Sequence, residues 1–286
     1  MKQWRFVFTG SRDAFFNMAL DEAILLSCRS GQSLPTLRLF LWEPPGVSIG
    51  YFQSLEKAVD LNKCKENNID VVRRITGGRA VLHETEITYS LCASIKEYPE
   101  LGKNISETYQ KISFALLESL KSLKVFGEWV KPKRESIQFT EDSDFSKPCF
   151  MSNSRYEITV AEKKLIGSAQ RRFQNSFLQH GSLPLGNGKF DLADLLSEKF
   201  FTSENENSQM RKKKSEEKST HLEKILKRKV EHEEVISALK RGFSQFFDVE
   251  MNEEELTQTE FEVAQVLKEK KYLTEKWNFR KSSLRT

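Results

Sequence analysis

A pair of glycines between two apolar runs constrains this chain more than any other feature. Gly77 and Gly78 follow the strand-like Val71-Val72 and precede the apolar Ala80-Val81-Leu82. Glycine has no Cβ, so it reaches positive φ and lets another group lie directly against the backbone. A bare Gly-Gly between two short strands is typical of a tight turn. The sequence therefore predicts two strands that meet at an accessible stretch of main chain.

The charge around this turn indicates a ligand. Arg73, Arg74 and Arg79 crowd a few residues of chain, and Thr76 and His83 lie beside them. Like charges at short range repel one another, so a turn that only reverses the chain gains nothing from three arginines. We interpret the stretch as a loop that wraps a ligand carrying polar or anionic groups.

Composition excludes several classes of protein. With 45 basic and 41 acidic residues among 286, the net charge of +4 is too mild to indicate nucleic-acid binding. The four cysteines form no CxxC pair, so we expect no zinc site. No apolar run approaches the roughly 20 residues that span a bilayer. The N-terminus leads into strand-like Phe6-Val7-Phe8 without a signal segment, so we expect a reducing cytoplasm and free thiols.

Strands and helices alternate along the first two hundred residues. The clearest strand is Ile87–Ile95, where apolar and polar residues alternate. Helices are expected over Ala14–Arg29, capped by Asp13, and from Ser106 to about Leu123. Further strands are expected at Leu37–Trp42, Val47–Phe52, Tyr156–Val160, Leu165–Gln170 and Ser176–His180, and further helices at Leu55–Asn68 and Phe190–Leu196. This order predicts an α+β fold with a mixed or mostly antiparallel sheet flanked by helices.

The composition changes after residue 200. We expect a main domain over 1–200, a charged linker over 201–220 and a small helical C-terminal segment over 221–286. The linker contains the basic run Arg211–Lys214, which could bind an anion. Acidic residues flank the run on both sides, so a solvated connection is favoured.

One cysteine differs from the other three. Cys28 and Cys64 lie in predicted helices and Cys92 in a predicted strand, where a cysteine usually packs as an inert apolar residue. Cys149 follows Pro148 in a polar loop, and reactive groups are frequently carried by loops. Position alone does not make it catalytic, so a second observation is needed.

That observation is a lysine before a run of small residues. Lys164 precedes Gly167-Ser168-Ala169, which would leave room for a ligand against the sheet. A lysine ammonium close to Cys149 would stabilise the thiolate, which is the nucleophilic form. His83 and His180 each end an apolar strand, and we favour a buried, hydrogen-bonded histidine over a general base for both.

Three motifs in order resemble the biotin/lipoate protein ligase family. They are Arg73-Arg74-Ile75-Thr76-Gly77-Gly78-Arg79-Ala80-Val81-Leu82-His83, Lys164-Leu165-Ile166-Gly167-Ser168-Ala169-Gln170 and Gln179-His180-Gly181-Ser182. The resemblance covers roughly Trp4 to Leu196. The glycine- and arginine-rich motif of the biotin branch is missing, which favours the lipoyl or octanoyl branch.

Within this branch the chain is most similar to the cysteine-dependent octanoyltransferases that load the glycine cleavage H protein. Their nucleophile lies about fifteen residues before the lysine, as Cys149 does before Lys164. The resemblance implies transfer of octanoyl from octanoyl-acyl carrier protein to a lysine of a lipoyl domain through a Cys149 thioester, with Lys164 lowering the thiol pKa and contacting the carbonyl. It also implies substrate contacts from Arg73, Thr76, Gly77, Gly78, Arg79, Ala80, His83, Gly167, Ser168 and Ala169. We expect no metal, no cofactor and a monomer.

Three alternatives stay open at this point. The chain could move octanoyl from the H protein to other lipoyl domains, or it could be an ATP-dependent lipoate ligase in which Cys149 takes no part. The third is a non-enzymatic module that binds anionic partners through its arginines. The classical single-step octanoyltransferases fit less well, because their cysteine follows the lysine.

Overall fold

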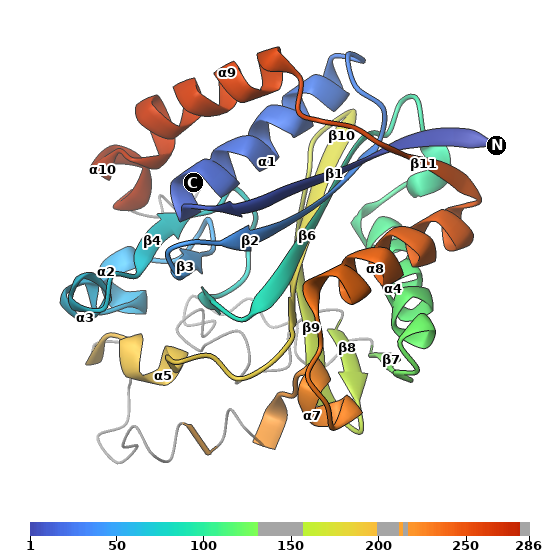
Figure 1. Cartoon of the computed structure of the whole chain (residues 1–286). Helices are drawn as coiled ribbons and strands as arrows, with labels where there is room; N and C mark the ends of the chain where they lie inside the picture. The colour runs from blue at the N-terminus through green and yellow to red at the C-terminus, as the bar shows by residue number, and fades with distance from the viewer. Residues whose placement is uncertain (131–156, 199–211, 214–216, 281–286) are drawn as a thin grey trace.

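The computed structural model describes residues 1–130, 157–198, 212–213 and 217–280, and Figure 1 shows their arrangement. The strands are β1 (Lys2–Arg12), β2 (Thr36–Trp42), β3 (Gly46–Ile49), β4 (Asp70–Arg73), β5 (Val81–His83), β6 (Glu86–Ser94), β7 (Glu128–Val130), β8 (Glu157–Val160), β9 (Lys163–Arg172), β10 (Ser176–Pro184) and β11 (Val249–Glu253). The helices are α1 (Ala14–Arg29), α2 (Leu55–Ala58), α3 (Leu61–Glu66), α4 (Ile105–Ser122), α5 (Leu192–Leu195), α7 (Leu222–Leu226), α8 (His232–Phe247), α9 (Gln258–Leu267) and α10 (Glu275–Asn278).

Two sheets organise the described part of the chain. The larger has eight strands in the order β11-β1-β2-β6-β10-β9-β8-β7, and the smaller has the order β4-β3-β5. In the larger sheet β1 runs parallel to β2 and β11, and the other neighbours are antiparallel. The α+β class with a mainly antiparallel sheet is therefore confirmed.

Helices cover both faces of the large sheet. In Figure 1, α1 and α9 lie over one face and α4 and α8 over the other. Strand β6 serves both cores, because its side chains alternate: Tyr89 and Leu91 belong to the core beneath α4, and Cys92 belongs to the core beneath α1. The predicted alternation of this strand is therefore confirmed, with both faces buried.

Helix ends follow their capping residues. Helix α1 spans the predicted residues, and the Asp13 side chain accepts a hydrogen bond from Phe16 N at 2.9 Å. Helix α4 begins one residue before the predicted cap Ser106, because Asn104 accepts from Glu107 N at 2.9 Å. Local hydrogen bonding thus decides each start.

One predicted helix is wrong as a single element. The stretch Leu55–Asn68 forms two short helices, α2 and α3, separated at Val59–Asp60. Val59 has extended backbone, and the Asp60 carboxylate accepts from Asn62 N and Lys63 N, which starts a second helix. A good capping residue inside an apolar pattern therefore outweighs the pattern.

The strands on either side of the glycine pair do not pair with each other. Strand β3 lies between them, parallel to β4 and antiparallel to β5. The two strands are confirmed, but the segment 74–80 crosses β3 as a loop and does not close a hairpin.

The C-terminal segment is helical, as predicted, but it also contributes a strand. Strand β11 pairs with β1 at the edge of the large sheet, with Trp4 opposite Met251. Helix α8 packs on α4 where Gly242 lies against Ser119; a Cβ on Gly242 would be 2.1 Å from the Ser119 hydroxyl. The division into 1–200, 201–220 and 221–286 stays a prediction, and the last part shares a sheet with the first.

Candidate active site

The glycine loop crosses the end of β3 and lies against β9. A Cβ built on Gly50 would be 2.0 Å from the Gly78 carbonyl oxygen, so these two backbones touch and only glycine fits at position 50. Gly78 has φ 93°, and a Cβ on it would lie 3.8 Å from the Cβ of Ala169. A Cβ on Gly77 would meet no described atom within 4 Å. Gly78 therefore makes the turn, whereas Gly77 borders open space.

Arg74 braces this loop from inside. Its guanidinium donates to the carbonyl oxygens of Ser48, Gly77 and Arg79, each at 2.8 Å, and its side chain is buried. These bonds hold both sides of the turn to β3. The Arg74 side chain thus shapes the loop by bonding to the main chain of the loop.

Arg73 is a structural cation in the described residues. Its guanidinium donates to the carbonyl oxygens of the Gly50–Gln53 segment on one side and of Trp277 and Asn278 on the other. Burial and then the nearby charge of Arg280 lower the pKa of Arg73 to about 10. All three guanidinium nitrogens donate to main-chain carbonyls, so Arg73 joins the loop after β3 to α10; a direct substrate contact stays a prediction without geometric support.

The next residues of the motif have different surroundings. Arg79 is half-buried, and its carbonyl accepts from Arg74. Ala80 is fully buried in the core of the small sheet, with Val47 and Ile49. Ala80 therefore packs in that core, and its contact with substrate stays a prediction.

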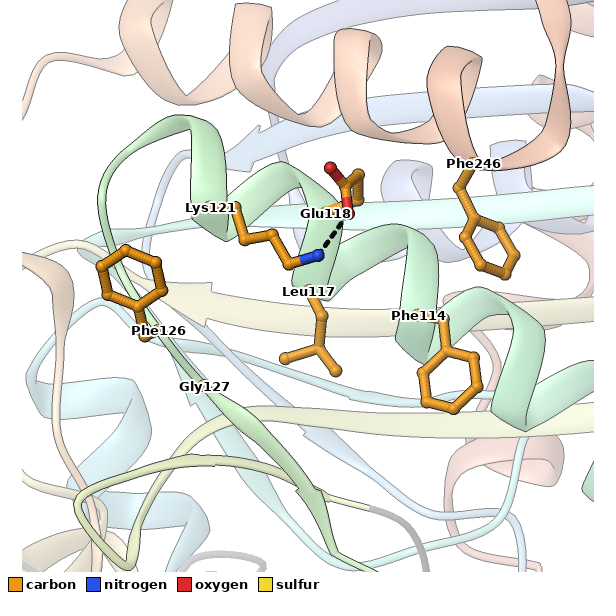
Figure 2. A pocket seen from close by; sticks show the side chains of 7 residues that line it. All are labelled: Phe114, Leu117, Glu118, Lys121, Phe126, Gly127 and Phe246. Atoms are coloured by element: carbon orange, nitrogen blue, oxygen red, sulfur yellow. Dashed lines mark hydrogen bonds and ion pairs between the residues drawn. The ribbon is translucent and has the colours of Figure 1, made fainter.

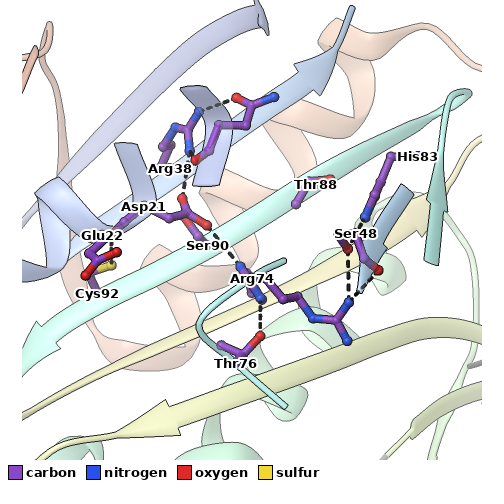
Figure 3. Close-up of polar contacts among 12 residues, drawn as sticks. Asp21, Glu22, Arg38, Ser48, Arg74, Thr76, His83, Thr88, Ser90 and Cys92 are labelled. Carbon is purple, nitrogen blue, oxygen red and sulfur yellow. Dashed lines mark hydrogen bonds and ion pairs between the residues drawn. The ribbon is translucent and has the colours of Figure 1, made fainter. Parts of the chain in front are cut away.

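Thr76 begins a buried hydrogen-bond network that sequence reasoning did not find. The Thr76 hydroxyl and His180 Nε2 are 2.7 Å apart, and His180 Nδ1 is 3.0 Å from Asp21 Oδ2. Asp21 Oδ1 accepts from Arg38 Nη1 and from the Ser90 hydroxyl, each at 2.7 Å (Figure 3). A histidine that donates through Nδ1 to a carboxylate has Nε2 left to accept from the Thr76 hydroxyl.

The charges in this network are set by burial and by Arg38. Burial lowers the pKa of His180, although its bond to Asp21 opposes the shift. Burial would raise the pKa of Asp21, but Arg38, then His180 and Ser90, lower it overall. The network therefore contains a carboxylate paired with a guanidinium and a neutral histidine.

His83 lies in a second network of the same form. Its Nε2 is 2.7 Å from the Ser48 hydroxyl and its Nδ1 is 2.7 Å from Glu86 Oε1. Trp42 stacks on its ring with centroids 3.9 Å apart and 7° between the planes. Ser182 and Thr88 also donate to Glu86. Both histidines are thus buried and hydrogen-bonded, as predicted.

The small residues of β9 point to different faces. Ala169 faces the glycine loop, across from His180 in β10. Ser168 points to the α4 side, where its hydroxyl is 2.7 Å from the Tyr89 hydroxyl. Gly181 permits this contact, because a Cβ there would be 2.6 Å from both side chains. The glycine loop therefore has Ala169 beneath it, whereas Ser168 contacts the opposite core; the contact of Ser168 with substrate stays a prediction.

Lys164 is a buried cation at the start of β9. Its side chain is 3% exposed, and its Nζ donates to Glu157 Oε1 at 2.6 Å. The backbone carbonyl of Lys164 accepts from Thr220 N at 2.9 Å. The prediction that this lysine is more than a solvated turn residue is therefore supported by its burial.

Cys28, Cys64 and Cys92 are buried, as the sequence predicted. Cys149 lies outside the described residues. Burial raises the pKa of Cys28 to about 12 and of Cys64 to about 11, and it raises the pKa of Cys92 well above its ordinary value. These three thiols stay protonated at neutral pH, so they are poor nucleophiles.

A pocket on the outer side of α4 is separate from these residues. It is lined by Phe114, Leu117, Glu118, Lys121, Phe126, Gly127 and Phe246 (Figure 2). Its ion pair, Lys121 with Glu118 at 2.7 Å, is an exposed pair within one helix. None of the candidate residues lines it.

Two further observations limit what the described residues can do. They contain no group of three or more histidine, cysteine, aspartate or glutamate side chains arranged to hold a metal ion. None of their helices is long and apolar enough to cross a membrane.

The residues missed from the sequence are mainly buried charges. Asp21 is a charged residue of α1, yet it is 1% exposed. Arg38 is fully buried. Its place in an otherwise apolar strand is the sequence signal that could have identified it, because an arginine buried in a sheet needs an acidic partner. Glu86 and Glu157 carry no such signal.

Known proteins resemble the chain over nearly its whole length. Residues 13–244 match the lipoyl protein ligase A/B catalytic domain. The chain is 39% identical to an octanoyltransferase LipM from Kyrpidia tusciae and 38% identical to one from Carboxydothermus hydrogenoformans, covering 98% of this chain and 100% of each relative.

Solved structures agree with this match. A bipartite lipoate protein ligase from Thermoplasma acidophilum, studied with its E2 lipoyl domain, superposes with a TM-score of 0.79 at 26% identity, covering 99% of this chain and 100% of that one. A lipoate-protein ligase A bound with ATP superposes with a TM-score of 0.75 at 27% identity, covering 97% of this chain and 98% of that one. The chain therefore belongs to the lipoyl protein ligase A/B catalytic domain family.

Proposed function

We propose that this chain is an octanoyltransferase of protein lipoylation. It takes octanoyl from octanoyl-acyl carrier protein and passes it to a lysine of a lipoyl domain, with the glycine cleavage H protein as the first candidate acceptor. The relatives named octanoyltransferase, at 35–39% identity over almost the full chain, support this class of reaction. We place it in the cytoplasm because carrier proteins and lipoyl domains would be its substrates.

One structural observation carries the proposal. Lys164 is a buried ammonium at the start of the strand that continues to Ala169, beneath the glycine loop. A cation that begins an apolar strand can attract a carbonyl oxygen, and the open space beside Gly77 can receive a chain of methylenes. Each buried CH₂ would contribute about 0.8 kcal/mol to binding.

The cysteines support a covalent route. Cys28, Cys64 and Cys92 are buried with raised pKa values, which leaves Cys149 as the candidate nucleophile. In the first step the Cys149 thiolate attacks the donor thioester, a new thioester forms, and the carrier thiol leaves with a proton. In the second step the acceptor amine attacks this thioester, an amide forms, and Cys149 is released.

This sequence of steps balances without ATP. The first step exchanges one thioester for another, so its equilibrium constant is near one. The second replaces a thioester with a more stable amide, which drives the cycle. Lys164 would stabilise the Cys149 thiolate and the oxyanion that forms in each attack.

Intact-protein mass spectrometry tests the nucleophile. Incubated with octanoyl-acyl carrier protein and no acceptor, the protein should gain one octanoyl group, and Cys149→Ala should gain none. Cys64→Ala is the matched control, since a buried, protonated thiol should not affect the adduct. An octanoyl adduct that persists in Cys149→Ala would exclude Cys149 from the reaction.

Two related reactions are separated by offering other donors. Transfer from octanoyl-H protein would indicate the amidotransferase reaction, and transfer from octanoate plus ATP would indicate a ligase. The similarity to a lipoate-protein ligase A bound with ATP makes the second comparison necessary. We expect octanoyl-acyl carrier protein to be the best donor of the three.

A further inference from the structure

The carboxylate beside Lys164 has no part in the reaction as written above. Glu157 Oε1 is 2.6 Å from Lys164 Nζ, and the side chain of Glu157 is 12% exposed. An ammonium buried as deeply as that of Lys164 loses most of its hydration, which favours the neutral amine unless an anion lies beside it. Glu157 is such an anion.

A β-bulge brings the two side chains to one face of the sheet. Ile158 lies opposite Ile166, but Thr159 lies opposite Lys164, so β9 has one extra residue, Leu165. Side chains alternate along a strand and opposite residues share a face. If the register of Ile158 and Ile166 continued without a bulge, Leu165 would lie opposite Thr159, and Lys164 would lie opposite Val160 and point away from Glu157. The bulge therefore aims the lysine at the carboxylate.

Two chain segments fix the backbone of the lysine. On one side β8 and β9 are joined by a tight turn in which Ala161 and Glu162 both have positive φ, at 47° and 63°. On the other side Thr220 N donates to Lys164 O at 2.9 Å, and Ser219 bridges to Lys164. The backbone position is thus fixed, and the side chain needs its own restraint.

The neighbouring titratable groups along the backbone do not replace Glu157. Lys163 precedes Lys164, and Lys218 and His221 flank Ser219–Thr220; all three are bases. Glu217 belongs to the same segment but is exposed. Glu157, by contrast, is an acid whose carboxylate contacts the ammonium at hydrogen-bond distance.

We propose that Glu157 is a positioning residue for octanoyl transfer: it keeps Lys164 protonated and fixes the direction of its ammonium. The inference rests on the proposed function, in which Lys164 acts on the acyl carbonyl and on Cys149. Glu157 itself touches no reacting atom.

The test compares Glu157→Gln and Glu157→Asp with the control Glu162→Gln. Glu162 lies in the same hairpin and is exposed, so its loss should leave transfer unchanged. In Glu157→Gln we expect kcat to fall by about 10- to 100-fold with little change in KM, because the neutral amide no longer supplies the negative charge of Glu157 beside the ammonium. Glu157→Asp keeps the charge and should recover part of kcat.

A pH profile separates positioning from a general loss of structure. In Glu157→Gln the buried lysine should lose its proton at a lower pH than in the wild type. The alkylation of Cys149 by iodoacetamide should then need a higher pH, with Glu157→Asp in between. A wild-type kcat and alkylation midpoint in Glu157→Gln would overturn the inference. So would a midpoint at lower pH, since Glu157 would then only weaken the field of Lys164.

The outcome is distinguishable from failure of the proposed function. If Cys149→Ala still forms the octanoyl adduct, the assignment of Cys149 as the nucleophile is wrong. The pH dependence of kcat in Glu157→Gln then still tests the role of Glu157, because it does not depend on which residue is the nucleophile. If Cys149→Ala loses the adduct while Glu157→Gln behaves as wild type, only the positioning role fails. Should Glu157→Gln not fold, Glu157→Asp still tests it through its intermediate profile.

Discussion

Two buried networks of hydroxyl, histidine and carboxylate flank the glycine loop, and they differ in how the carboxylate is compensated. Thr76, His180 and Asp21 form one, in which Arg38 pairs with the carboxylate at 2.7 Å. In the other, His83 links Ser48 to Glu86. Among the described residues no lysine or arginine forms an ion pair with Glu86.

The difference is whether the carboxylate has a permanently charged partner. Arginine stays protonated throughout the physiological range, so Asp21 always has a cation beside it. Burial would raise the pKa of Glu86, but the charge of His83, and then hydrogen bonds, lower it. Asp21 is therefore held by a permanently charged partner, whereas Glu86 is held by a histidine and two hydroxyl groups.

The largest expected effect comes from removing one carboxylate charge from each network. Asp21→Asn leaves Arg38 buried without its ion pair, which should lower the free energy of unfolding by about 3–5 kcal/mol. Glu86→Gln leaves no buried arginine without an ion pair, so the free energy of unfolding should fall by only about 1–3 kcal/mol. Urea denaturation measures both. Equal losses in the two variants would mean that Arg38 does not distinguish the networks.

A smaller effect should appear in the pH dependence of stability. The pKa of His180 is lowered in the folded state, so the unfolded chain binds more protons as the pH falls below about 6.5. Stability should therefore decrease from that pH downward, and the decrease should be shallower in His180→Gln. Denaturation midpoints at several pH values between 5 and 8 provide the measurement. An unchanged slope in the variant would remove His180 as the cause.

The smallest effect concerns cations outside both networks. Arg171 and Arg280 lie over the Tyr51 ring at 4.5 and 4.2 Å, and among the described residues neither forms an ion pair. If they meet an acidic carrier, Arg280→Gln should raise KM for octanoyl-acyl carrier protein by about fivefold or less, and added salt should reduce the difference. Kinetics at low and high salt test this, with Arg241→Gln as an exposed control. A salt-independent KM in the wild type would contradict a role in docking.

Local patterns predicted elements better than they predicted contacts. The strict alternation of Ile87–Ile95 and the Asp13 cap identify β6 and α1, because both depend on neighbours in sequence. Strand β11 was missed, since its pairing with β1 joins residues about 250 apart and its own sequence is polar. The insertion of β3 between β4 and β5 was missed for the same reason.

The candidate site was predicted through its motifs and only partly through its geometry. Lys164 stands out in the sequence because small residues follow it, but the bulge at Leu165 that turns it towards Glu157 has no sequence signal. The three arginines of the glycine loop were interpreted together as ligand-binding. Arg73 and Arg74 instead bond backbone carbonyls, because a buried guanidinium satisfies its five donors from the nearest main chain.

The bonds between Arg73 and α10 have a consequence for biosynthesis. The carbonyl oxygens of Trp277 and Asn278 are made some 205 residues after the arginine that binds them. A ribosome that has released only the first two hundred residues therefore holds a chain in which Arg73 and the loop after β3 lack their bonds to α10. If the proposed function holds, competence to accept an acyl group should arise late in translation, after the C-terminal helices emerge.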